Sequence, residues 1–166
     1  MKLLLHLEDD NISDVTGYRM RAAARAVAIN SEGKIAIMYV GNSNYYKLPG
    51  GGIEGRESLG ETLKREMLEE TGCEIGVVSD LGYITELRRE SLLQISFCFL
   101  VNIVKIVQEP QLTDREKEGG FELRWLDFDQ AEKLISASPI MRFQGVKSIN
   151  KRDLRFVQEA RKVTGK

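Results

Sequence analysis

The spacing of apolar residues along the chain predicts an alternation of strands and helices. Apolar runs and alternating patterns indicate strands at residues 2–7, 34–40, 75–90, 92–107 and 121–126. A period near 3.6 residues indicates helices through Leu59, Leu63 and Met67, at residues 129–137 and at residues 150–163. The apolar run at 92–107 is the longest, and such a run is typical of a central strand buried on both faces.

Two segments are compatible with more than one type of secondary structure. Residues 75–90 suit either one strand or a hairpin. Residues 18–30 contain alanines that favour a helix by propensity, but Arg25, Val27 and Ile29 alternate with alanines as in a strand. On a strand, these small residues would either leave room for a substrate or let a helix pack closely.

Composition narrows the class of protein. A length of 166 residues is enough for one domain with a hydrophobic core, so a single domain over residues 1–166 is expected. The net charge of −1 provides no basic field and argues against a nucleic-acid partner. Two cysteines and one histidine argue against a disulfide framework and a zinc site. No apolar run approaches the roughly 20 residues of a membrane helix, and no signal peptide is evident, so a cytoplasmic protein without a membrane partner is expected.

Three glutamates, Glu66, Glu69 and Glu70, stand three and four positions apart and therefore share one face of the predicted helix. Glu66 and Glu70 fall beside its apolar stripe, where repulsion and desolvation penalise their charges. Oxygen ligands without a nearby histidine favour Mg²⁺ or Mn²⁺ as the compensating cation. Without metal the carboxylates should destabilise the fold, so Glu70→Gln should be more stable than the parent in EDTA. The alternative is a charged helix face exposed to water.

The stretch 51–73 resembles the box that defines the Nudix family. The family pattern is glycine, five residues, glutamate, seven residues, then Arg-Glu-aliphatic-any-Glu-Glu-any-Gly-aliphatic. The matching positions are Gly51, Glu57, Arg65-Glu66-Met67, Glu69-Glu70 and Gly72-Cys73. Two positions depart from the pattern: Cys73 stands where an aliphatic residue is usual, and Arg56 replaces a turn glycine.

The resemblance implies a fold and a chemistry. The fold class is α/β, a Nudix-type α/β/α sandwich on a mixed sheet, and it favours a strand at 18–30. Nudix proteins use Mg²⁺ and water to hydrolyse a nucleoside diphosphate linked to another group. The expected substrate is therefore a small nucleotide derivative, and a homodimer is left open.

The resemblance also implies roles for individual residues. Glu66, Glu69 and Glu70 match the metal ligands, and Gly50 matches the glycine whose carbonyl joins them. Arg65 and Glu57 match a pair that braces the loop against the helix. In the acidic, loop-like segment 112–120, Glu118 is the first choice for a further ligand or general base, and Glu116 is the reserve.

Further residues are candidates for binding substrate. Arg88 and Arg89 could hold phosphate oxygens, or simply form a solvated strand end. Tyr46, with Tyr45 beside it, could stack on a base, or both could be ordinary strand residues.

Two other functions compete with hydrolysis of a small nucleotide. A Nudix-fold module could bind a nucleotide without hydrolysing it, although such modules usually lack some of the box carboxylates. RNA decapping would use the same chemistry but would require a basic channel, which the composition does not indicate.

Overall fold

The computed structural model describes residues 1–9, 12, 14–88, 91–138 and 146–166, with the backbone alone for 146–148. The strands are β1 Leu3–Glu8, β2 Arg19–Ile29, β3 Ile35–Val40, β4 Tyr45–Lys47, β5 Cys73–Arg88, β6 Leu92–Ile106 and β7 Phe121–Leu126. The helices are α1 Leu59–Thr71, α2 Asp114–Glu118, α3 Phe128–Ala137 and α4 Val146–Thr164, with a 3₁₀ turn at Gly41–Ser43. The segment 75–90 thus lies within one long strand, β5, rather than forming a hairpin.

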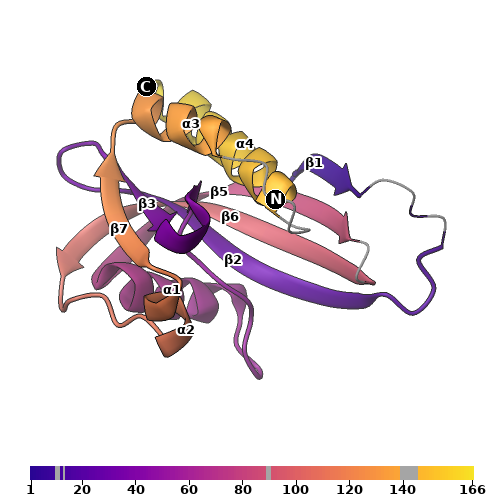
Figure 1. Cartoon of the computed structure of the whole chain (residues 1–166). Helices are drawn as coiled ribbons and strands as arrows, with labels where there is room; N and C mark the ends of the chain where they lie inside the picture. Colours follow the sequence, from indigo (N-terminus) through magenta and orange to yellow (C-terminus); the bar gives the residue numbers. More distant parts are fainter. Residues whose placement is uncertain (10–11, 13, 89–90, 139–145) are drawn as a thin grey trace.

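These strands form a seven-stranded mixed sheet in the order β1-β5-β6-β2-β3-β4, with β7 paired to the other edge of β3. β1 runs parallel to β5 and β2 parallel to β6, whereas β5 and β6 are antiparallel. α3 and α4 cover one face of the sheet and α1 covers the other (Figure 1). The predicted α/β/α sandwich on a mixed sheet is confirmed.

The ambiguous segment is a strand, β2, paired with β6 along its whole length. Ala24, Ala26 and Ala28 are fully buried against Leu63 and Met67 of α1. The small side chains therefore let the helix pack closely, and the second of the two readings of these alanines is the correct one.

β6 lies inside the sheet, as predicted, but it is not buried on both faces along its length. Burial alternates through its first half, and near its end Val104 is 65% and Ile106 73% exposed. The reason is length: the 15-residue strand spans about 50 Å, whereas the 13-residue helix α1 spans about 20 Å. One helix cannot cover such a strand.

The acidic segment after residue 112 is not simply a loop, because it forms the short helix α2. Thr113 begins this helix with a capping box: its hydroxyl accepts a hydrogen bond from Glu116 N, and the Glu116 carboxylate accepts one from Thr113 N at 2.8 Å. The helix α4 also begins earlier than predicted, at Val146. None of the helices in the described ranges is long and apolar enough to cross a membrane.

Candidate active site

A cavity of about 640 Å³ opens beside the glycine loop, residues 48–58, which joins β4 to α1. Residues from β2, β4, α1 and the α2 region line it together with this loop. Its basic side chains are Arg21, Arg25, Lys47 and Arg115; its acidic ones are Glu54, Glu66, Glu70 and Glu116; its aromatic ones are Tyr45 and Phe121. The cavity therefore combines charges of both signs with aromatic rings.

Local sequence fixes where α1 begins and ends. Ser58 caps the helix in a reciprocal capping box with Glu61, and Gly72 ends it in the left-handed conformation at φ 69°. The loop approaches the helix closely, because a Cβ on Gly51 would lie 2.1 Å from Glu66 Oε1. The Glu66 carboxylate occupies the space that a side chain at position 51 would need, so only glycine fits there.

Arg65 links the loop to the helix, as predicted. Its Nε donates to Glu57 Oε1 at 2.7 Å and its Nη2 to Glu57 Oε2 at 3.0 Å, a bidentate pair. Nη2 also donates to Gly52 O at 3.1 Å, and Nη1 donates to Glu66 at 2.8 Å and Glu69 at 3.1 Å. The hydrogen bonds from Arg65 lower the pKa of Glu57 to about 2, and Glu57 in turn raises the pKa of Arg65.

Two of the three helix glutamates are buried. Glu66 is 9% and Glu70 1% exposed, whereas the Glu69 side chain is 41% exposed. Desolvation raises the pKa of Glu66, and the neighbouring Glu70 raises it further, against the opposing effect of Arg65. The description of this helix face as simply solvated is therefore wrong for Glu66 and Glu70.

Glu70 is held by a cation from within the chain. Lys47 Nζ donates to Glu70 Oε1 at 2.8 Å, and Gly50 N donates to Glu70 Oε2 at 2.5 Å. Because the Lys47 side chain is 12% exposed, this ion pair is largely shielded from water. The expectation that the carboxylates stand uncompensated without metal is thus wrong: Arg65 and Lys47 already neutralise part of their charge.

These ion pairs bear on whether the residues fit a metal. Within the described residues, no group of three or more His, Cys, Asp or Glu side chains is arranged to hold an ion. Glu66 and Glu70 line the cavity together, but Glu69 turns to Arg65 and does not line it. The donors suit Mg²⁺ or Mn²⁺ in kind, since all are oxygens, but Glu69 would have to leave Arg65 to join Glu66 and Glu70.

Gly50 occupies a position that only glycine can adopt easily. Its φ is +123°, and a Cβ there would lie 2.2 Å from Ala24 O in β2. While its N–H donates to Glu70, its carbonyl accepts a hydrogen bond from Arg25. The predicted carbonyl ligand therefore faces a guanidinium in this structure and retains a second lone pair.

The structure places Glu116, not Glu118, on the cavity wall. Both lie on α2, where positions two apart differ by about 200° around the axis and so face opposite ways. The sequence order of preference, Glu118 before Glu116, is therefore not the one that the geometry favours. The helix at Asp114–Glu118, which the loop-like composition does not predict, separates the two side chains.

Tyr46 points away from the cavity. Its ring packs against Tyr39 with centroids 4.9 Å apart, and its hydroxyl accepts a hydrogen bond from Arg124 at 2.9 Å. Tyr45 and Lys47, the alternate residues of β4, line the cavity instead. Strand alternation just before the glycine loop is the signal that could have identified both residues from the sequence.

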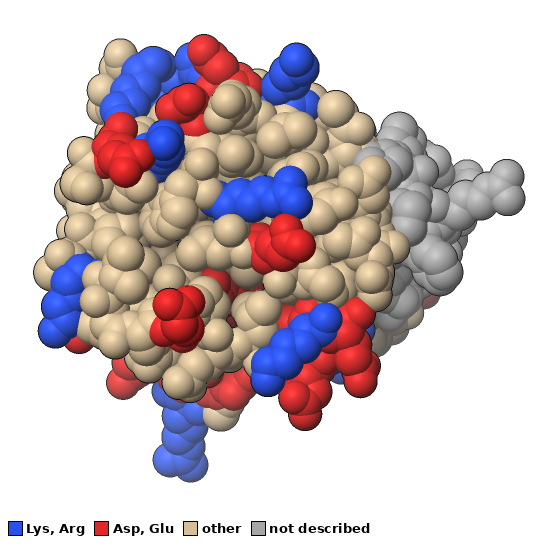
Figure 2. Space-filling model, turned by 60° about the vertical axis from the view of Figure 1, so that its left-hand side comes forward, with Lys and Arg blue, Asp and Glu red and all other residues tan. Residues whose placement is uncertain are grey.

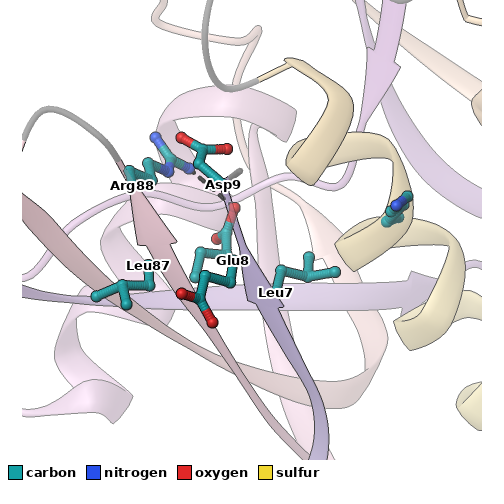
Figure 3. A pocket seen from close by; sticks show the side chains of 7 residues that line it. Leu7, Glu8, Asp9, Leu87 and Arg88 are labelled. Atoms are coloured by element: carbon teal, nitrogen blue, oxygen red, sulfur yellow. Dashed lines mark hydrogen bonds and ion pairs between the residues drawn. The ribbon is translucent and has the colours of Figure 1, made fainter. Parts of the chain in front are cut away.

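Arg88 does not reach this cavity either. It pairs with Glu86 at 2.9 Å and lines a separate, smaller cavity formed by the ends of β1 and β5, where it lies beside Asp9 (Figure 3). Arg89 lies outside the described residues. Arg88 is therefore not placed to bind phosphate beside Glu66 and Glu70. The basic residues that line the cavity with these carboxylates are Arg21, Arg25, Lys47 and Arg115, and sequence reasoning missed them.

Comparison with solved structures finds the same fold in proteins of low sequence identity. A MutT protein from Methanosarcina mazei Go1 is 17% identical, with 90% of this chain and 99% of that chain covered and a TM-score of 0.62. A NUDIX hydrolase from Nitrosomonas europaea is 16% identical, with 87% and 90% covered and a TM-score of 0.67. A UDP-X diphosphatase is 20% identical, with 92% and 68% covered and a TM-score of 0.60.

Comparison with curated proteins gives no match. A family model, described as the NUDIX domain, matches residues 19–143. That range includes β2, the glycine loop, all of α1 and α2, and hence every residue that lines the cavity. The chain therefore belongs to the NUDIX family.

Proposed function

We propose that this chain is a Mg²⁺-dependent hydrolase that cleaves a phosphoanhydride bond in a nucleoside diphosphate derivative. Membership of the NUDIX family supports hydrolysis of such bonds. The observation that carries the assignment is the buried pair Glu66 and Glu70, side by side on the wall of a cavity that also holds four basic side chains. Buried carboxylates beside basic side chains suit chemistry on phosphate.

Glu66, Glu69, Glu70 and the Gly50 carbonyl would hold the metal. Mg²⁺ bound there supplies charge neutralisation for the phosphates and lowers the pKa of water. Rotation of Glu69 away from Arg65 and release of Glu70 by Lys47 would complete the ligand set. Lys47, once released, remains in the cavity as a cation for substrate oxygens.

The other residues of the cavity would bind and orient the substrate. Arg21 and Arg115 are exposed and offer positive charge to an arriving polyphosphate. Tyr45 and Phe121 present rings on which a base could stack. Arg65 and Glu57 keep the loop in place, and Glu116 is the favoured group to accept a proton from the attacking water.

A binding module without hydrolysis is the second candidate, because the carboxylates are engaged by Lys47 and Arg65 rather than arranged as a metal cage. The complete set of box glutamates supports the enzyme. RNA decapping has less support: on the face shown in Figure 2, basic and acidic side chains are interspersed and form no continuous basic channel.

The test is a screen for hydrolysis with and without Mg²⁺. Because the similar structures include a MutT protein and a UDP-X diphosphatase, the panel contains nucleoside triphosphates, nucleotide sugars and dinucleoside polyphosphates. We expect Mg²⁺-dependent release of phosphate or pyrophosphate, or of a nucleoside monophosphate, from at least one class. Tight nucleotide binding without turnover of any class would favour the binding module instead.

Glu116 and Glu118 give a matched pair of variants for the general base. Since Glu116 lines the cavity and Glu118 does not, Glu116→Gln should lower kcat by about 10- to 100-fold, and Glu118→Gln should leave it within about twofold. Glu116 also caps α2, so its variant is compared with Thr113→Val, which removes the hydroxyl of the same cap. An equal loss in Thr113→Val would assign the effect to the helix rather than to the proton acceptor.

A further inference from the structure

Arg25 is a buried guanidinium with hydrogen-bond donors left over. The residue is 8% exposed and lines the cavity. Nη1 is the one guanidinium nitrogen with a hydrogen-bond partner in the described part of the chain, Gly50 O, and Nε is buried without any. A guanidinium has five N–H donors, so most of its capacity is unused.

No carboxylate within the described ranges forms an ion pair with Arg25, although several lie nearby. Glu70 has Lys47 at 2.8 Å, and Asp153 has Arg152 at 2.7 Å. Glu86 has Arg152 at 3.3 Å and Arg88 at 2.9 Å. Each of these acids therefore has a basic partner other than Arg25.

A buried cation in this state is costly. Loss of hydration disfavours the charged form, and a buried group without its hydrogen bonds adds a further penalty. An anion that enters the cavity would supply the missing negative charge and hydrogen-bond acceptors, and would offset the cost of burying Arg25.

The position of Arg25 in the cavity indicates which kind of anion it would bind. Arg25 lies under the glycine loop, with its guanidinium on the carbonyl of Gly50 and Gly50 N on Glu70. Arg21, four residues earlier on the same face of β2, also lines the cavity. An anion that bridges these two arginines would lie next to the carboxylates proposed to hold the metal.

We propose that Arg25 is a receptor for a phosphate group of the substrate, which it binds through the donors that it does not give to Gly50. This inference rests on the proposed function for the identity of the anion. It also gives Arg25 a second effect: the same guanidinium orients the Gly50 carbonyl, so phosphate binding and the position of that carbonyl depend on one side chain.

The test measures binding of inorganic pyrophosphate in EDTA by calorimetry, where neither metal nor turnover contributes. Arg25→Gln removes the charge, and Arg25→Lys keeps it but cannot form the planar fork. We expect both variants to bind pyrophosphate at least about tenfold more weakly than the parent. Arg19→Gln is the control, because Arg19 is exposed on the same strand and does not line the cavity; its affinity should match the parent.

Melting curves in EDTA separate a receptor from a purely structural group. A receptor leaves Arg25→Gln at least as stable as the parent without anion, and pyrophosphate raises the melting temperature of the parent more than that of the variant. Unchanged pyrophosphate affinity in Arg25→Lys, or a less stable Arg25→Gln with unchanged affinity, would overturn the proposal. Failure of the nucleotide screen alone would remove the proposed hydrolase but would leave this binding result intact.

Discussion

We expect Glu70→Gln to lower kcat by about 100-fold or more, with the fold retained. Glu70 is 1% exposed, faces the cavity and accepts hydrogen bonds from Lys47 and from Gly50 N. Glutamine keeps the shape of the side chain but loses the charge that would bind a metal acting mainly in the transition state. The measurement is steady-state turnover of the best substrate from the panel at saturating Mg²⁺.

The control for this variant is Glu74→Gln. Glu74 is exposed on β5, 3.6 Å from Lys105 and away from the cavity, so its turnover should equal that of the parent. Near-normal turnover in Glu70→Gln would remove Glu70 from the catalytic site, whatever the screen shows for the parent.

The second large effect concerns stability without metal. Lys47→Gln leaves the buried Glu70 carboxylate without its cation, and breaking a buried ion pair by removing one partner costs about 3 kcal/mol. For a chain of this length, the melting temperature in EDTA should fall by roughly 6–12 °C. Mg²⁺ should then raise it more in the variant than in the parent, because the metal no longer competes with Lys47 for Glu70.

Lys105→Gln is the matched control for this loss. The Lys105–Glu74 pair is exposed on both sides, and pairs of that kind contribute about 0–1 kcal/mol. A Lys47→Gln variant as stable as the parent in EDTA would show that Glu70 does not depend on this ion pair. The sequence alone predicts that Glu70→Gln is more stable than the parent in EDTA, and this ion pair reverses that expectation. The variant should be less stable than the parent, because it leaves the largely buried Lys47 ammonium without its carboxylate.

The fold could be predicted from the sequence to the extent that local pattern decides it. Periodicity identified the core strands and α1, and the Nudix box identified the loop and its brace by Arg65 and Glu57. Local pattern did not predict burial where burial depends on whether a helix covers the strand, as at the exposed end of β6 around Ile106. It also failed where a cap creates a helix, as Thr113 does for α2.

The site could be predicted less completely, because its cations come from elements distant in the sequence. Glu66 and Glu70 follow from helical spacing, but Lys47 meets Glu70 across 23 positions and Arg25 meets Gly50 across 25. The pairing of the glycine loop with β2 brings Arg25 to Gly50, and the pairing of β4 with β3 places Lys47 at the end of the same loop, beside α1. Arg88 shows the converse: two adjacent arginines look suited to phosphate, yet Arg88 ends at a different cavity, paired with Glu86.

The proposed hydrolysis depends on a divalent metal held by the glutamates of α1 at this cavity. Anomalous diffraction from crystals soaked in Mn²⁺ with a non-hydrolysable nucleotide tests it most directly, because it locates the ion itself. We expect an anomalous peak within about 2.0–2.3 Å of oxygens of Glu66, Glu69 or Glu70, with the Lys47 ammonium displaced from Glu70. Bound nucleotide with no Mn²⁺ peak at these carboxylates, or a peak only elsewhere on the chain, would contradict it.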